Sequence, residues 1–228
     1  PSKHEEIVRK HLLDWAKEHK VEAFADETGN VIMRVPATKG YENRKGVILQ
    51  GHMDMVPQKT ADTKHDFLKD PIETVVEGEW LTANGTTLGA DNGLGVALAM
   101  SVAEDKTVKH GPVEILVTYD EETGMSGAEA LKPGILKGDI LLNLDSEDEL
   151  ELCIGCAGGL DAVADFKYKS LKSPAGYKAF NFDVKGLAGG HSGMDISLYR
   201  ANANKVLVRA LIPLVEKYGA KLADFTGG

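Results

Sequence analysis

The chain has 228 residues, of which 43% are hydrophobic and 27% charged, and its formal net charge at pH 7 is −9. These values are typical of a soluble globular protein with one or two domains. The acidic chain has no block of Lys or Arg that would neutralise a row of phosphates, which disfavours nucleic acid as a partner. No apolar run approaches the roughly 20 residues that cross a bilayer, and the first residues carry no signal pattern. We therefore expect a cytoplasmic protein without membrane contact.

The beginning of the chain predicts a helix followed by a β-hairpin. Ser2 and Glu5 have the spacing of a capping box, and apolar residues recur at helical spacing from residue 7 to about residue 20. Residues 21–24 and 31–35 flank a polar turn, as in a hairpin.

Three later predicted strands lead directly to residues that commonly bind metals. The strands are residues 47–50, 113–119 and 140–144, and they lead to His52, to Glu121 with Glu122, and to Asp145. If these strands are parallel and joined by helical crossovers, their carboxyl ends share one edge of a sheet, where open α/β sheets place their sites. We therefore expect an α/β fold with a mostly parallel sheet flanked by helices.

Asp91 adds a further carboxylate, at or just before the start of a helix predicted over residues 96–103. Singly, each of these residues has a structural explanation as a strand end, a helix cap, a turn residue or a solvated side chain. Together they favour a site for divalent ions, because separate elements would otherwise each place a ligand on the same rim by accident. A pair of ions about 3.5–4 Å apart needs a bridging carboxylate.

Two residues next to these ligands suit supporting roles. Asp54, two residues after His52, could accept the free ring N–H of His52 and fix its tautomer, or it could be a turn residue. Glu121 and Glu122 point to different sides if strand geometry persists, so that one would bind metal and the other would act as a base. The sequence alone leaves open which does which.

Two other motifs point to weaker alternatives. Gly93-x-Gly95 lacks the third glycine of a dinucleotide site, and the phosphate-loop lysine is also missing, which disfavours nucleotide binding. Cys153 and Cys156 form a C-x-x-C motif without a second pair, so we expect two reduced, half-buried thiols.

The pattern changes near residue 157, where we place a boundary between domains 1–157 and 158–228. Residues 160–166 and 180–184 read as strands and are followed by a helical pattern, which predicts the start of a smaller α+β domain. A glycine-rich loop in this domain presents His191, and its neighbours alone favour a loop histidine without a function.

Several segments, taken in order, resemble the M20 metallopeptidases, and above all the cytosolic aminoacyl-histidine dipeptidases of bacteria, which are carnosinase-like. They contain Gly51-His52-Met53-Asp54, Gly89-Ala90-Asp91-Asn92, Asp120-Glu121-Glu122-Thr123, Leu144-Asp145-Ser146-Glu147 and Gly190-His191-Ser192-Gly193. Their order and spacing hold from Lys3 to Gly228.

The resemblance implies a zinc exopeptidase-like catalytic domain that hydrolyses dipeptides, including β-alanyl-histidine and other Xaa-His peptides. It implies two zinc ions, which cobalt or manganese could replace, bridged by Asp91 and by a water or hydroxide. His52 and Asp145 would complete the ligands of one ion, and Glu122 would bind the other. Glu121 would be the general base toward the bridging water.

The resemblance also assigns roles outside the metal ligands. His191 would stabilise the oxyanion from a lid, in place of the structural role that its neighbours favour. Asn202 or Asn204 would help to hold substrate, and the lid strands could pair in a homodimer. A cis peptide is expected at Asp91–Asn92.

Members of the family are longer and return to the catalytic domain after the lid with a further histidine ligand. We therefore expect this chain to be an N-terminal fragment, with weak or no activity on its own. Alternatives are another M20 activity, such as a tripeptidase or an N-acyl amino acid amidohydrolase, and a metal-binding module without catalysis. Glu121 argues against the last, because it binds no metal in the family scheme.

Overall fold

The computed structural model describes residues 1–146, 150–156, 158–160, 162–190 and 195–227. The chain divides into two compact units, Pro1–Leu152 and Cys153–Gly228, and each is described by itself. The assignment of these units to a catalytic and a lid domain stays a prediction.

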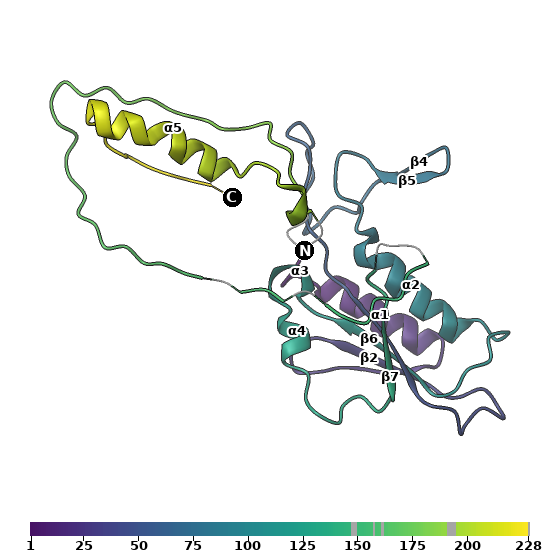
Figure 1. Ribbon diagram of the computed structural model, residues 1–228. Helices are drawn as coiled ribbons and strands as arrows, with labels where there is room; N and C mark the ends of the chain where they lie inside the picture. Colours follow the sequence, from purple (N-terminus) through teal and green to yellow (C-terminus); the bar gives the residue numbers. More distant parts are fainter. Residues whose placement is uncertain (147–149, 157, 161, 191–194, 228) are drawn as a thin grey trace. The chain divides into compact units, whose positions relative to one another are not determined.

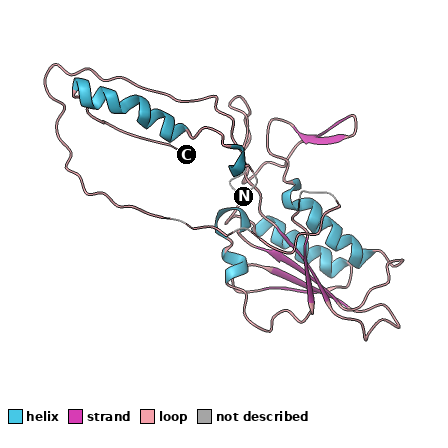
Figure 2. Ribbon diagram, in the orientation of Figure 1, coloured by secondary structure: helices cyan, strands magenta, loops and turns pink. Residues whose placement is uncertain are grey.

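A five-stranded sheet forms the centre of the first unit (Figures 1 and 2). In spatial order its strands are β1 (Glu22–Ala25), β2 (Val31–Val35), β6 (Val113–Thr118), β3 (Val47–His52) and β7 (Ile140–Asn143). The pairs β1/β2 and β2/β6 are antiparallel, whereas β6/β3 and β3/β7 are parallel. The expected α/β class is confirmed. The sheet is mixed, and its parallel pairs join the strands that lead to the candidate ligands.

The two long helices of this unit cover one face of the sheet. These helices are α1 (Glu6–Glu18) and α2 (Ala90–Glu104). Leu12 and Ala16 of α1 and Ala99 of α2 pack in one cluster with Met33 and Ile115 of the sheet. All six residues of β6 are buried, which explains why this strand reads as a nearly continuous apolar run.

The opposite face is covered by the segment that follows two short helices, α3 (Glu121–Gly124) and α4 (Ser126–Glu129). Leu131 and Ile135 of this segment pack against buried Ile32 and Leu116. The Glu114 carboxylate fixes the segment, because it accepts the backbone N–H groups of residues 137 and 138 at 2.6 and 2.8 Å.

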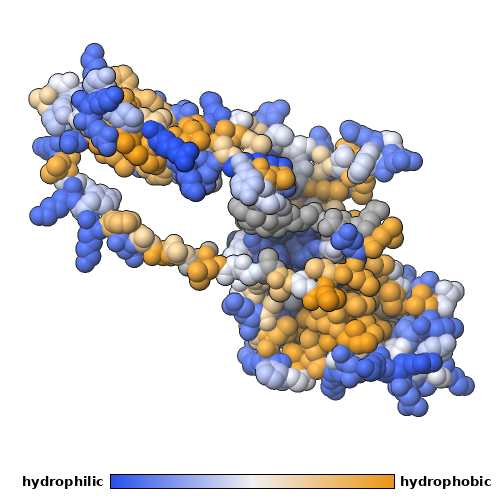
Figure 3. Space-filling model, in the orientation of Figure 1, coloured by the Kyte–Doolittle hydropathy of each residue, from blue (hydrophilic) through white to orange (hydrophobic). Residues whose placement is uncertain are grey.

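The elements that cover the rest of the sheet leave the side chains of strand β7 partly exposed. Its side chains Ile140, Leu141 and Leu142 are 41%, 51% and 45% exposed, and Figure 3 shows a hydrophobic patch on this unit. β7 is the last strand of the sheet, so its outer edge is unpaired in the part of the chain that the structure describes. A separate hairpin, β4 (Thr74–Glu77) with β5 (Trp80–Ala83), lies outside this sheet.

The predicted capping box at the start of α1 is wrong. Glu5 occupies the N-cap position without a side-chain cap, and Ser2 Oγ donates instead to Asp54 Oδ2 at 2.7 Å. Glu5 Oε1 accepts the N–H groups of Lys3 and Asp120. Both side chains are thus used outside the helix that their spacing suggested.

The described residues of Cys153–Gly228 contain a short 3-10 helix, η1 (Ile196–Leu198), and α5 (Ala203–Tyr218), but no strand. The described residues of 160–166 (all but residue 161) and those of 180–184 therefore do not form the predicted strands. Phe166 and Phe180 are 84% and 76% exposed. A strand is stable only when it pairs and packs, and these segments do neither.

The two cysteines of this unit, Cys153 and Cys156, are free and exposed rather than half-buried. In the described ranges, no helix combines the length and apolar character that a bilayer crossing requires.

The turn between β6 and α4 depends on a close approach at Gly127. Its N–H donates to the carbonyl of Tyr119, whose own N–H donates to Asn30 Oδ1. Asn30 Nδ2 in turn donates to the carbonyl of Gly127 at 2.8 Å. A side chain at position 127 would collide, because an added Cβ would lie 2.3 Å from the Tyr119 oxygen and 2.4 Å from Asn30 Oδ1.

We predict that Gly127→Ala lowers the free energy of unfolding by about 1–3 kcal/mol, because the crowded backbone must move. Gly93→Ala in α2 is the matched control, since nothing lies within 4 Å of its added Cβ. This control should be neutral or stabilising by up to about 1 kcal/mol. Chemical denaturation measures both, and equal stabilities for the two variants would contradict the role of Gly127.

Candidate metal centre

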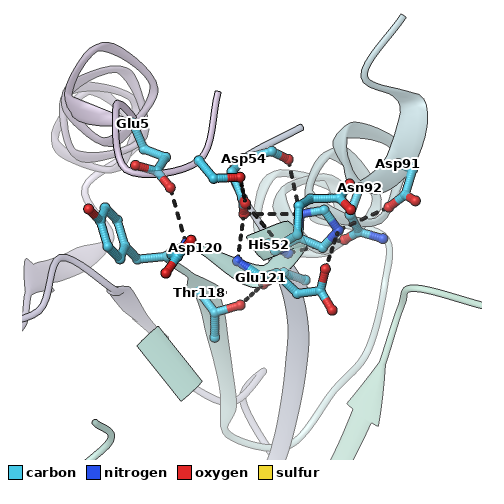
Figure 4. A network of polar contacts seen from close by, with 12 residues as sticks. Glu5, His52, Asp54, Asp91, Asn92, Thr118, Asp120 and Glu121 are labelled. Atoms are coloured by element: carbon cyan, nitrogen blue, oxygen red, sulfur yellow. Dashed lines mark hydrogen bonds and ion pairs between the residues drawn. The ribbon is translucent and has the colours of Figure 1, made fainter. Parts of the chain in front are cut away.

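The carboxyl ends of the parallel strands β3, β6 and β7 place the predicted ligands at one corner of the sheet. Figure 4 shows His52, Asp91 and Glu121 there. His52 is the last residue of β3, Glu121 and Glu122 begin α3 after β6, and Asp145 follows β7. Asp91 reaches the same corner from the first turn of α2.

These residues form two overlapping groups around the imidazole of His52. His52, Asp91 and Asp145 each offer one ligand atom, and these atoms lie within 4.8 Å of one another, as do those of His52, Glu121 and Glu122. His52 Nε2 lies 2.9 Å from Asp91 Oδ1, 3.5 Å from Asp145 Oδ1 and 3.9 Å from Glu121 Oε2. The imidazole is buried, whereas the Asp91 side chain is 56% exposed.

The other ring nitrogen of His52 faces Asp54. Nδ1 lies 3.0 Å from the backbone carbonyl oxygen of Asp54 and 3.4 Å from its Oδ1, so the carbonyl is the nearer acceptor. In the neutral imidazole, a proton kept on Nδ1 would leave the lone pair of Nε2 free for a metal ion, as in histidines that bind metal through Nε2.

The carboxylate of Asp54 also holds the backbone that carries the glutamates. Oδ1 accepts the N–H of Glu121 at 3.0 Å, and Oδ2 accepts the N–H of Glu122 at 3.1 Å and the hydroxyl of Ser2. Burial favours the neutral acid, but the hydrogen bonds from His52, Ser2 and the two amides outweigh it and hold the pKa of Asp54 well below its usual range. Asp54 is therefore a fixed negative charge behind the site.

Asn92 lies in the site, but the sequence predicted only the cis peptide bond that precedes it and no role for its side chain. The Asp91–Asn92 peptide is cis, as the resemblance implied. The side chain of Asn92 is buried, and its Oδ1 accepts the backbone N–H of His52. Its Nδ2 donates to the Leu144 carbonyl and to Asp145 Oδ1, both at 2.8 Å. Asn92 thus links the ends of β3 and β7. The neighbouring Asp91 is the one signal that could have pointed to it.

The strand geometry on which the prediction for Glu121 and Glu122 depended does not persist, because β6 ends at Thr118. Asp120, with φ of 53°, turns the chain, and the two glutamates follow in the short helix α3. Both side chains are half-buried, and both approach His52. The choice of ligand and base stays a prediction.

Among the described residues, the acidic side chains around His52 are not balanced by an equal number of basic side chains. Burial opposes protonation of His52, but the hydrogen bonds that its ring donates to Asp145 and Asp54 outweigh it and raise its pKa to about 11. Burial, followed by repulsion from neighbouring carboxylates, raises the pKa of Asp91, Glu121 and Glu122, whereas the hydrogen bond with His52 lowers that of Asp145. Carboxylate oxygens around one imidazole nitrogen are a donor set for a hard or borderline divalent cation, so these residues fit a metal.

The other predicted site residues belong to the second unit or lie outside the description. His191 lies outside the described residues. Asn202 caps α5, because its Oδ1 accepts the N–H of Lys205 at 3.0 Å, and Asn204 lies in the first turn of that helix. Capping explains Asn202 structurally, and a contact of either asparagine with substrate stays a prediction.

The fold and the donor set are those of an α/β metal-binding domain. Residues 48–222 match the model of the peptidase family M20/M25/M40, and the chain belongs to this family, whose members are metal-dependent. The resemblance read from the sequence is thereby confirmed.

Over all 228 residues the chain is 50% identical to the cytosol non-specific dipeptidase of Escherichia coli strain K12, of which it covers 47%. The crystal structure of the aminoacylhistidine dipeptidase from Vibrio alginolyticus matches 95% of this chain and 44% of that chain, with a TM-score of 0.69 and 48% identity. The crystal structure of aminopeptidase PepT from Bacillus cereus matches 65% of this chain and 40% of that chain, with a TM-score of 0.54 and 29% identity. The chain spans less than half the length of these relatives.

We predict that Asn92→Ala in the full-length gene product weakens divalent-metal affinity by roughly tenfold to hundredfold, the usual cost of losing a group that orients metal ligands. The substitution frees both the Asp145 carboxylate and the backbone N–H of His52. Competition with a metallochromic chelator measures the affinity. Asn84→Ala is the control, because Asn84 is exposed and bonds Glu73. An unchanged affinity in folded Asn92→Ala would show that Asn92 does not orient the ligands.

Proposed function

We propose that the gene product is a zinc-dependent dipeptidase that hydrolyses Xaa-His peptides, including β-alanyl-histidine. The observation that carries the proposal is the contact of buried His52 Nε2 with the carboxylates of Asp91, Asp145 and Glu121. This centre lies in a chain that is 50% identical to a dipeptidase and 48% identical to an aminoacylhistidine dipeptidase.

The donor atoms fit zinc, which takes imidazole nitrogen and carboxylate oxygen. His52, Asp91 and Asp145 would hold one ion, and Asp91 and Glu122 the other; cobalt or manganese are substitutes. When bound, zinc lowers the pKa of a water molecule and polarises the peptide carbonyl.

The chain's own residues supply the proton transfers. Glu121 takes a proton from the attacking water and delivers it to the leaving amine. Its side chain is 33% exposed, so substrate and water reach it, while Asp54 fixes its backbone N–H at 3.0 Å. Asp54 also keeps the proton of His52 on Nδ1.

The second unit would complete the reaction. His191 donates to the oxyanion, and Asn202 or Asn204 binds substrate. Small peptides are the partners of this site, and the second unit would form a homodimer. The Escherichia coli relative is a cytosol dipeptidase by name, and we infer a cytoplasmic location here.

A second candidate is another M20 activity, such as that of a tripeptidase or an N-acyl amino acid amidohydrolase. The 29% identity and the TM-score of 0.54 to an aminopeptidase favour this alternative over a module without catalysis. The donor set would be the same, and only the preferred substrate would differ.

We predict that Glu121→Gln lowers kcat for β-alanyl-histidine by about 10²–10⁴-fold while the bound metal content stays unchanged, because the amide cannot accept the proton. Release of histidine by the full-length gene product measures the rate, and atomic emission measures the metal. Glu129→Gln, at an exposed position of α4, is the matched control. Wild-type turnover in Glu121→Gln would remove Glu121 from the mechanism.

We also predict that a chelator abolishes histidine release and that added zinc restores it, because the carboxylate cluster cannot polarise a carbonyl by itself. A tripeptide and an N-acetyl amino acid are assayed beside β-alanyl-histidine. Turnover of the tripeptide alone would support the second candidate, and turnover that resists the chelator would contradict both candidates.

A further inference from the structure

The N-terminal turn of the chain makes contacts that the proposed chemistry does not yet use. Neither the Ser2 nor the Glu5 side chain caps α1: Ser2 donates to the carboxylate of Asp54, just beyond β3, and Glu5 accepts the N–H of Asp120, the residue before the two glutamates. We propose that Ser2 and Glu5 are positioning residues of the reaction, which hold the turn of Glu121 and Glu122 in its working geometry. This inference rests on the proposed function.

Glu5 acts on the residue that directly precedes the proposed base. Its side chain is among the fully buried ones of the structure, and its Oε1 accepts the N–H of Asp120 at 3.1 Å (Figure 4). The same oxygen accepts the N–H of Lys3 at 3.0 Å. Asp120 has a φ of 53°, in the narrow left-handed region, so this hydrogen bond restrains the residue at which the chain turns from β6 into α3.

Ser2 acts through Asp54. Its hydroxyl donates to Asp54 Oδ2 at 2.7 Å, and the Asp54 carboxylate accepts the N–H groups of Glu121 and Glu122. The amides of residues 120, 121 and 122 are therefore all held by side-chain carboxylates. One of these carboxylates belongs to the N-terminal turn, and the other is hydrogen-bonded to it.

The alternative is that Glu5 has a purely structural role. Buried polar groups are normally hydrogen-bonded, so Glu5 could serve stability alone. Glu5 Oε2, however, is buried without a hydrogen-bond partner in the described part of the chain. Burying a carboxylate oxygen without a partner is unfavourable, so stability alone does not explain Glu5. Its hydrogen bond to the N–H of Asp120, the residue before the proposed base Glu121, explains it better, because this bond helps to fix the position of the base.

Small displacements of a catalytic group have large kinetic effects. A misplacement of about 1 Å can cost about 10²-fold in rate. The loss of partners one layer behind a metal site costs roughly 10–100-fold. The inference therefore predicts a change in kcat, with KM nearly constant, in protein that remains folded.

The test uses the full-length gene product loaded with zinc, with the variants Glu5→Ala, Glu5→Gln, Ser2→Ala and the control Glu6→Ala. Glu6 is the exposed neighbour in α1. The readouts are kcat and KM for β-alanyl-histidine, zinc content, and amide hydrogen exchange of the peptide that covers residues 118–124.

We expect Glu5→Ala to lower kcat by roughly 10–100-fold and to speed exchange of this peptide, with KM and zinc content unchanged. Glu5→Gln keeps an acceptor for the Asp120 N–H and should recover most of kcat. Ser2→Ala should lower kcat less, because Asp54 still accepts both amides, and Glu6→Ala should match the wild type.

Wild-type kcat in folded Glu5→Ala would overturn the inference. If Glu5→Ala does not fold, Ser2→Ala decides, and wild-type kcat in that variant would likewise overturn it. A failure of the proposed function gives a different result, since the zinc-loaded wild type would then release no histidine. In that case the exchange measurement decides, and unchanged exchange at residues 118–124 in every folded variant would overturn the positioning role.

Discussion

The buried carboxylate of Asp54 connects the fold to the candidate metal centre. It faces the imidazole of His52 and accepts the backbone N–H groups of Glu121 and Glu122. Strands β3 and β6 are adjacent and parallel, so one side chain just beyond β3 reaches the turn beyond β6. Asp54 therefore holds both parts of the site, because its backbone carbonyl and its carboxylate face Nδ1 of His52 and its carboxylate also sets the position of both glutamates. A change in sheet register would displace both parts of the site together.

The same corner brings several carboxylates together, and a divalent cation would reduce the repulsion between them. Burial and mutual repulsion raise the pKa of Asp91, Glu121 and Glu122, and the protonated imidazole offsets only part of the charge. A ligand that binds the native state stabilises it by mass action. The site is therefore unfavourable as a set of free carboxylates and favourable as a set of ligands, which is the usual trade between stability and function.

The positions of the candidate ligands and of Asp54 could be predicted from the sequence, but the contacts of Ser2, Glu5 and Asn92 could not. His52, Glu121, Glu122 and Asp145 follow apolar strands, and parallel pairing brings such ends together. Ser2 and Glu5 have a local spacing that suggests a helix cap, and tertiary bonds to residues far along the chain overrode it. Asn92 carries no pattern that reveals its bonds across two strands. The strands expected in the second unit show the same limit, because alternation predicts a strand only where a partner is present.

The positions of the candidate ligands depend on strand pairs that are far apart in the sequence, and this affects the order of folding. The hairpin β1/β2 is local, whereas β3 pairs with β6 and β7 across long stretches of sequence. Contacts of this kind form late, because the entropy of closing a long loop is lost before they contribute. Every candidate ligand in the first unit lies at the end of an element that these contacts position. A metal ion held by these residues would therefore have no preformed site in the nascent chain, and it would bind the finished sheet rather than nucleate its assembly.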